Sequence, residues 1–319
     1  MFCFSGGFNV DKISEVPTVV LPILSTLFLG WFSRRKNILN DESVNGIKSL
    51  VMQFMLPAVL LGAFYKTVFN AELILIAVCM FFCCLAGLGL GLLFVRTYKG
   101  DKNIKILPFL TCGFEAGMMG YGLYAMLFPP EDLHNFAMVD LGQVLFVFTV
   151  YSAMLNKQKG FSTKQTLKST VTSPVFISIV LGVALSASGI GFLIQQSALG
   201  KPLDVALNYI GTPTGALMIF VVGYQLVWSK SGMRESLLTV ALRAVIMAVL
   251  CAVYVFVLKN FMEVSVSLFW AIILMFTLPA PFVLPFFSED EKQKGYVATT
   301  LSTGTVLSIV FFSIISILR

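Results

Sequence analysis

The sequence TCGFEAGMMGYG, residues 111–122, interrupts an apolar stretch that runs over residues 107–128. Four glycines and one carboxylate, Glu115, lie within it. Prolines interrupt a second apolar stretch, in TLPAPFVLPFF at residues 277–287. An interrupted helix frees backbone N–H and C=O groups at membrane depth. Lipid cannot satisfy these groups, so they must line a cavity or meet each other. A matched pair of broken spans is the best pointer in a sequence to the substrate site of a secondary transporter.

The composition indicates a membrane protein. The chain of 319 residues is 57% hydrophobic and 12% charged, with a mean hydropathy of +0.89, whereas a soluble domain is about 25% charged. Apolar stretches of about 20 residues recur along its whole length, as helices that span a bilayer require. We predict ten spans, at residues 17–33, 44–65, 72–96, 104–128, 133–155, 168–191, 203–227, 235–258, 264–287 and 294–318. Basic residues in cytoplasmic loops explain the pI near 9.0, so no nucleic-acid partner is expected.

The basic residues also predict the orientation of the chain. If the N-terminus lies outside, the inside loops hold 15 lysines and arginines and the outside loops hold 5. This bias follows the positive-inside rule and predicts that both termini are extracellular, in a protein of the cell (plasma) membrane. Residues 1–16 lack the basic start and cleavage site of a signal peptide. We expect them to form a short extracellular N-terminus before a first helix that is retained.

Weak internal similarity divides the chain into two halves of five spans each. Similar short motifs surround Pro17 and Pro174, Pro57 and Pro213, and Gly142 and Gly304, at offsets of 157, 156 and 162 residues. Because five is an odd number, the second copy must enter the membrane from the opposite side. We therefore predict a first inverted repeat at residues 17–156, a cytoplasmic linker at 157–167 and a second repeat at 168–319.

Several motifs resemble those of the auxin efflux carrier family. The sequence at residues 113–122 is similar to the family's fourth-helix motif, which usually reads Gly-Asn-x-Gly-Phe-x-Gly-x-Pro. Val139-Asp140 and Gln143 resemble the Tyr-Asp and Asn that follow it. Leu278-Pro279-Ala280 resembles the ninth-helix Met-Pro-x-Ala, and residues 301–308 resemble the tenth-helix Ser-Thr-Leu-Leu-Ser. The resemblance covers essentially the whole chain.

This resemblance implies an all-α membrane protein of ten transmembrane helices, a 5+5 inverted repeat with a scaffold part and a transport part. Broken helices four and nine would cross at their breaks, as in NhaA-like antiporters and bile-acid symporters. It further implies small organic anions, such as auxin, malate or malonate, as substrates, and homodimers. The short segment at residues 156–167 is similar to that of prokaryotic members, so a prokaryotic-type permease is expected.

The chain departs from the family at Glu115, where Asn is usual, and at Gly122, where Pro is usual. A carboxylate at the centre of a spanning helix persists only when it is protonated, paired or facing water. Glu115 could be a protonatable coupling site that donates to an anionic substrate. It could recognise an amine or zwitterion directly. A third interpretation is structural: a buried Glu that accepts N–H groups of the broken helix opposite.

Residues at the two breaks are the candidate substrate site. Spans four and nine contain no lysine or arginine at depth, so recognition of an anion would depend on backbone amides at the half-helix ends. The candidate substrate-binding residues are Gly113, Glu115, Gly117, Pro279, Ala280, Pro281 and Gln143. Simple close packing is the alternative for the glycines, since Gly113 and Gly117 form a GxxxG motif.

Four further residues have roles to test. Glu115 and Asp140 are the candidate coupling residues. Asp140 could pair with Arg243, coordinate a cation or hold a broken-helix amide, and a plain structural contact is as good an interpretation. For Arg243 we favour a side chain that snorkels to the inside surface. Pro57 and Pro213 are expected to kink their helices beside the site, with kinks that face lipid as the alternative.

Three classes of function compete. A secondary transporter of a small organic solute, a carboxylate above all, leads. Within this class, a sodium- or proton-coupled symporter of the bile-acid or antiporter type is the runner-up. A transporter-like sensor is the second class, and an intramembrane enzyme is the third. An intramembrane enzyme would need motifs such as HExxH or Gly-x-Gly-Asp, which do not occur. Without a Walker loop, ATP hydrolysis is not expected. No cofactor or metal is predicted. The predicted partners are the lipid bilayer, a small-molecule substrate and a proton or sodium co-ion.

Overall fold

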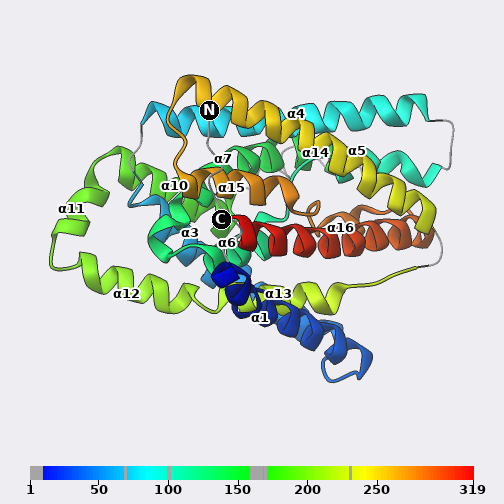
Figure 1. Ribbon diagram of the computed structural model, residues 1–319, viewed down its shortest axis with the longest axis horizontal. Helices are drawn as coiled ribbons and strands as arrows, with labels where there is room; N and C mark the ends of the chain where they lie inside the picture. Colours follow the sequence, from blue (N-terminus) through cyan, green and yellow to red (C-terminus); the bar gives the residue numbers. More distant parts are fainter. Residues whose placement is uncertain (1–9, 68–69, 99–101, 159–167, 169–170, 230–231) are drawn as a thin grey trace.

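The computed structural model describes residues 10–67, 70–98, 102–158, 168, 171–229 and 232–319, and within them every regular element is helical (Figure 1). The elements form a bundle in which α4, α14 and α16 run lengthwise through the molecule. Many large apolar side chains point outward, including those of Phe54, Phe82 and Phe256. Side chains of this kind on the outside of long helices match a lipid surrounding.

Interruptions by π-helical or 3₁₀ turns are frequent in the first half of the chain. Its elements are α1 (Val10–Arg35), α2 (Asp41–Leu50), η1 (Val51–Met55), α3 (Leu56–Phe64), α4 (Ala71–Thr97), η2 (Lys102–Ile106), α5 (Leu107–Leu110), η3 (Ala116–Gly120), α6 (Tyr121–Leu127), η4 (Pro130–Asp132), α7 (Leu133–Phe146), η5 (Val147–Tyr151) and α8 (Ser152–Gln158). Of the η elements, η1, η3 and η5 are π-helical. Turns of this kind often mark functional sites.

The second half has fewer interruptions. Its elements are α10 (Pro174–Ala187), α11 (Ile190–Gln196), α12 (Gly200–Gly211), α13 (Thr214–Gln225), α14 (Met233–Phe261), α15 (Val266–Thr277), η6 (Leu284–Phe287) and α16 (Glu291–Leu318). Gly189, whose φ of +74° favours glycine, lies between α10 and α11. The two helices bend by 81° there. Pro213 lies between α12 and α13, where a proline ends the preceding helix.

Seven helices of the described residues are long and apolar enough to cross a membrane, and the bent pair α10–α11 would be an eighth. The segments predicted as spans four and nine are broken into shorter pieces. Helix α1 begins at Val10, inside the segment expected to be an extracellular N-terminus, and its membrane-length apolar part begins at Pro17. Residues 168 and 171 in span six are helical, and the long helix α10 of that span begins at Pro174. Most of the predicted linker, 159–167, lies outside the described residues.

The helices pack in two groups. In the first, which we call the α1–α13 group, α1 packs against α13, and α3 packs against α10 and α12. In the second, the crossover group, α4 packs against α7 and α5, while α14 packs against α4, α15 and α16. The groups meet where α13 contacts η3 and α6, and where α3 contacts α7. Both broken spans belong to the crossover group.

Basic residues gather at one end of the bundle. Figure 1 shows the last turns of α1 and α4 and the first turns of α14 and α16 at the same end, on the right. These turns carry Arg34, Arg35, Arg96, Arg234 and Lys294. All five belong to the loops that the charge count assigns to the inside. The fold therefore places at one end five of the 15 basic residues that the charge count assigns to the inside.

Candidate functional site

The first break separates α5 from η3. Helix α5 ends at Leu110, and the chain turns at Gly113, whose φ of +65° is the left-handed region that favours glycine. A Cβ atom on Gly113 would lie 3.3 Å from Cγ of Pro281 in the other break. Glu115 then caps the next helical segment, since its Oε1 accepts a hydrogen bond from the backbone N–H of Met118 at 3.2 Å. The glycine-rich sequence thus breaks the span at the predicted place.

The second break separates α15 from η6. Helix α15 ends at Thr277, and residues 278–281 run in non-helical conformation before a short turn leads to η6. Pro279 and Pro281 have no N–H group, so neither can continue a helical hydrogen-bond ladder. Ala280 between them is buried, with 2% of its surface exposed. The proline pair therefore produces an extended segment at the centre of the span.

The two breaks bind each other directly through Glu115. Its backbone N–H donates to the carbonyl of Pro279 at 2.9 Å. Its carboxylate Oε2 accepts the backbone N–H of Phe282 at 2.5 Å, while Oε1 accepts that of Met118. The carboxylate therefore takes one N–H group from each broken span. This geometry is that of the third, structural interpretation of Glu115.

Arg243, in the middle of α14, binds the carbonyl groups of both breaks. Its guanidinium donates to the carbonyls of Leu110 at 2.9 Å, Gly113 at 2.7 Å and Leu278 at 3.0 Å. The guanidinium also lies 5.4 Å from the ring centre of Phe114, within the range of a cation–π contact. Only 7% of Arg243 is exposed. The expectation that this side chain snorkels to the inside surface is therefore wrong, as is its pairing with Asp140.

A chain of polar side chains from α7 reaches the first break. The N–H of Phe114 donates to the Gln143 side-chain oxygen. The Gln143 amide donates to Oδ1 of Asp140 at 3.0 Å, and the Tyr121 hydroxyl donates to Oδ2 at 3.0 Å. Asp140 thus binds Gln143, and Gln143 in turn accepts the backbone N–H of Phe114 in the broken helix. Both carboxylate oxygens of this buried aspartate have partners, as the low dielectric of the bundle requires.

The crossover therefore gathers most of the predicted site residues. Gly113, Glu115, Pro279, Ala280, Pro281 and Gln143 lie at the two breaks, with Asp140 behind Gln143. Gly117 is one turn further on and faces α3, since a Cβ there would lie 3.3 Å from Leu56. Sequence reasoning missed Arg243 as a crossover residue. The signal was available, because it is an arginine deep within a long apolar span, and such residues are rare unless they have partners.

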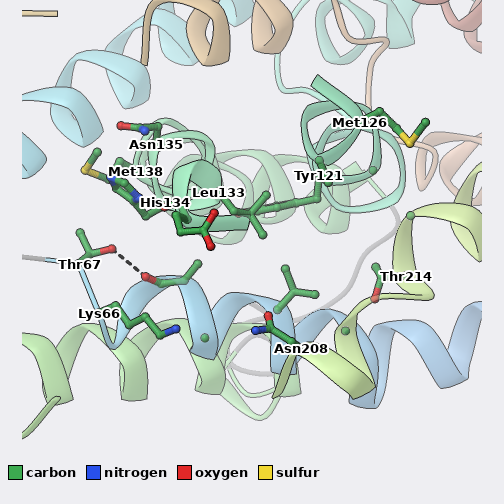
Figure 2. Close-up of a pocket in the computed structure, with 18 of the residues that line it drawn as sticks. Lys66, Thr67, Tyr121, Met126, Leu133, His134, Asn135, Met138, Asn208 and Thr214 are labelled. Atoms are coloured by element: carbon green, nitrogen blue, oxygen red, sulfur yellow. Dashed lines mark hydrogen bonds between the residues drawn. The ribbon is translucent and has the colours of Figure 1, made fainter. Parts of the chain in front are cut away.

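A cavity of about 940 Å³ lies between the two groups of helices (Figure 2). The labelled residues of its wall are Lys66, Thr67, Tyr121, Met126, Leu133, His134, Asn135, Met138, Asn208 and Thr214. They come from the end of α3, from α6 and α7, and from α12 and α13. Tyr121 joins the cavity to the crossover, since it lines the former and its hydroxyl binds Asp140. His134 is also part of this wall.

The wall of the cavity is mostly apolar but carries an uneven set of charges. Lys66 and Asp204 form an ion pair of 2.5 Å in this wall, and Tyr65 also donates to Asp204. Three further carboxylates line the cavity, those of Glu72, Glu131 and Glu263. One lysine thus faces four carboxylates, which gives the lining a net negative formal charge if His134 is neutral. A field of this sign raises the local concentration of cations.

Two glycines of the cavity wall meet each other. A Cβ atom built on Gly122 of α6 would lie 2.9 Å from Cα of Gly215 on α13, and the converse distance is also 2.9 Å. Real side chains essentially never approach so closely, so both positions require glycine unless a helix moves. Gly122 belongs to a broken span and Gly215 to the α1–α13 group. This contact, called here the glycine seam, is a place where the two groups touch in the wall of the cavity.

A bundle of membrane-length helices with two broken helices that bind each other at its centre is the architecture of a membrane transporter. Residues 16–164 match the membrane transport protein family. An uncharacterized transporter of Methanocaldococcus jannaschii is 25% identical over 213 residues, which cover 65% of this chain and 68% of that protein. Both similarities are to membrane transport proteins, and they agree in kind with the resemblance of residues 113–122 to the auxin efflux carrier family.

Proposed function

We propose that the protein is a secondary transporter that moves a small organic solute across the cell membrane by alternating access. One observation carries the proposal: the cavity between the two helix groups is lined by Tyr121 and Gly122, on a broken span. The solute sites of secondary transporters lie at such an interface and are formed by discontinuous helices. The crossover group would move against the α1–α13 group about the glycine seam.

The predicted ten-span, 5+5 inverted architecture remains part of this proposal. Helical elements lie within all ten predicted segments, and the breaks fall in the fourth and the ninth. The gathering of basic residues at one end supports extracellular termini in the plasma membrane. The cavity would then open to the outside. A homodimer, which the resemblance implies, is proposed on that ground alone.

A small carboxylate is the first candidate solute, because the resemblance implies organic anions. The crossover amides that would bind it already donate to Glu115. A carboxylate could therefore use them only after Glu115 had left. Protonation of Glu115 would release it, so the coupling roles proposed for Glu115 and Asp140 are compatible with this candidate. Sodium coupling is the alternative to proton coupling.

A solute with a protonated amine, whether an amine or a zwitterion, is the second candidate. The observation that favours it is the charge of the cavity, in which the carboxylates of Glu72, Glu131 and Glu263 are additional to the Lys66–Asp204 pair. Such a solute would leave Glu115 in place. Uptake of carboxylates, amino acids and amines into proteoliposomes, with proton and sodium gradients applied separately, distinguishes the candidates. Saturable binding without uptake would instead favour a transporter-like sensor.

A cysteine introduced at Asn208 tests whether the cavity is the solute path. Asn208 lines the cavity, whereas the next residue on α12, Tyr209, is 84% exposed on the outer surface and does not line it. We expect a bulky methanethiosulfonate reagent to stop uptake by Asn208→Cys and to spare Tyr209→Cys and the wild type. The wild type controls for the native cysteines. Full uptake by labelled Asn208→Cys would contradict the proposed path.

A further inference from the structure

The crossover of this chain provides its own ligands. In transporters built on discontinuous helices, free backbone N–H groups usually face an anionic group of the substrate, and free carbonyls coordinate the coupling cation. Here the carboxylate of Glu115 accepts the N–H groups of Met118 and Phe282, at 3.2 and 2.5 Å. The position of an anion is thus occupied by a side chain of the protein.

The carbonyl groups are occupied in the same way. The Arg243 guanidinium donates to the carbonyls of Leu110, Gly113 and Leu278 at distances between 2.7 and 3.0 Å. A sodium ion bound there would need these oxygens and would meet the positive charge of the guanidinium. At most 9% of either Glu115 or Arg243 is exposed, and neither lines the cavity. Side chains of the protein therefore occupy both the position of the anion and the position of the cation.

We infer that Glu115 and Arg243 are internal ligands that exclude small anions and sodium from the crossover. Glu115 thereby determines specificity, since a solute carboxylate cannot reach the crossover amides while this side chain is in place. The inference deepens the proposed function and rests on it for its meaning in transport. For as long as Glu115 is in place, the solute can bind only at the cavity wall. Removal of the Glu115 side chain should turn the same amides into an open anion site.

Thermal unfolding of the purified protein tests this inference without a transport assay. The melting temperature is measured in potassium chloride, sodium chloride and potassium formate at equal ionic strength, for the wild type, Glu115→Ala and Glu131→Ala. Formate is the smallest carboxylate and fits the space that the Glu115 carboxyl leaves. Glu131 is the matched control, because its carboxylate lies at the exposed cavity mouth, away from the crossover.

We expect the same melting temperature in all three salts for the wild type and for Glu131→Ala. In Glu115→Ala, formate should raise the melting temperature over chloride by about 2–4 °C, and the rise should saturate. A Glu115→Ala protein that can be purified only in formate would also support the inference. A saturable rise with formate or sodium in the wild type would overturn it, and this arm needs no variant to fold. No response to formate in a folded Glu115→Ala protein would overturn it too.

The two failures can be told apart. A wild-type protein that transports no solute would contradict the proposed function and would leave these melting temperatures unchanged. A wild type that transports solutes but is also stabilised by formate or sodium would contradict only the internal-ligand inference, unless each ion is itself the transported solute. Uptake of labelled formate and sodium by the same preparation settles that last case, because transport of either ion through the crossover would also overturn the inference.

Discussion

Both broken spans interrupt a helix at the crossover, but they do so with different residues. The first is broken by glycine, so each residue of the break keeps its N–H and its carbonyl group. The second is broken by Pro279 and Pro281, which keep carbonyls but have no N–H. The glycine break consequently needs three polar side chains, those of Glu115, Gln143 and Arg243. The proline break borrows two of the same three, Glu115 and Arg243.

This difference teaches where the stability of the crossover lies. A glycine break is flexible and exposes many polar groups, so its geometry depends on partners from other helices. A proline break is stiff, because the φ angles are fixed by the rings themselves. Loss of a polar partner should therefore cost more than loss of a proline. The following predictions test this order, from the largest expected effect to the smallest.

Replacement of Arg243 by Ala should have the largest effect, because it leaves carbonyls of both breaks unpaired. We expect the free energy of unfolding to fall by about 3–5 kcal/mol, since hydrogen bonds to charged groups are strong and buried carbonyl groups without a donor are destabilising. The measurement is thermal or denaturant unfolding in detergent. Arg234→Ala is the matched control, because Arg234 is exposed in the first turn of the same helix. Equal stability of the two variants would show that Arg243 does not hold the crossover.

Replacement of Glu115 by Ala should come next, with a loss of about 2–4 kcal/mol from two buried N–H groups left without an acceptor. Glu115→Gln should be milder, because one amide oxygen can still accept. In transport, we expect Glu115→Gln to abolish proton-dependent uptake and to leave exchange of solute across the membrane possible. Uptake measured at several pH values checks this point. An unchanged pH dependence in Glu115→Gln would remove Glu115 from the coupling mechanism.

Replacement of Gly113 by Ala should cost about 1–2 kcal/mol, because a residue with a Cβ atom is strained at a φ of +65°. The new methyl group would also press on Pro281 at 3.3 Å. Gly89→Ala in α4 is the control, since open space surrounds that position. There we expect a gain of about 0.5–1 kcal/mol from helix propensity. Melting temperatures of the two variants that move in the same direction would contradict the glycine-break interpretation.

Replacement of Pro279 by Ala should have the smallest effect on stability, with a loss of about 1 kcal/mol or less. Transport should suffer more than folding, because the new N–H group lets the helix α15 extend into the crossover. Uptake rates and melting temperatures of the same preparation give both quantities. Pro202→Ala, on the outer face of α12, is the control. A Pro279→Ala protein with wild-type melting and wild-type uptake would mean that the stiff break is not required.

Much of this fold follows from local chemistry and could be read in the sequence. Long apolar stretches predict helices, and clustered glycines or prolines predict breaks wherever they occur, so the crossing residues Gly113, Glu115 and Pro279 were accessible. The kink at Pro213 follows from the same reasoning. The bend of 81° at Gly189 was missed, because one glycine in an apolar stretch does not usually bend a helix so far.

The partners of the breaks could not be predicted in the same way. Arg243 is 130 residues from Gly113 and 35 from Leu278 in the chain. Which carbonyls it meets depends on how α14 packs against α5 and α15, and this is a property of the assembled bundle. The charge of the cavity is likewise a sum over loops that only the fold brings together. The sequence therefore predicts where the backbone is broken, but it does not predict which side chains bind the freed backbone groups.

The glycine seam has a consequence for the rate at which the two helix groups can move relative to each other. Side chains that interlock across a helix contact must unlock before the helices can slide, and each such step adds to the activation barrier. At Gly122 and Gly215 backbone faces backbone, with no side chain on either surface. Little has to be rearranged for one group to pass the other at this point. The seam would therefore lower the barrier to sliding of one helix group past the other. The conformational change would be fast, and the packing elsewhere would keep its strength.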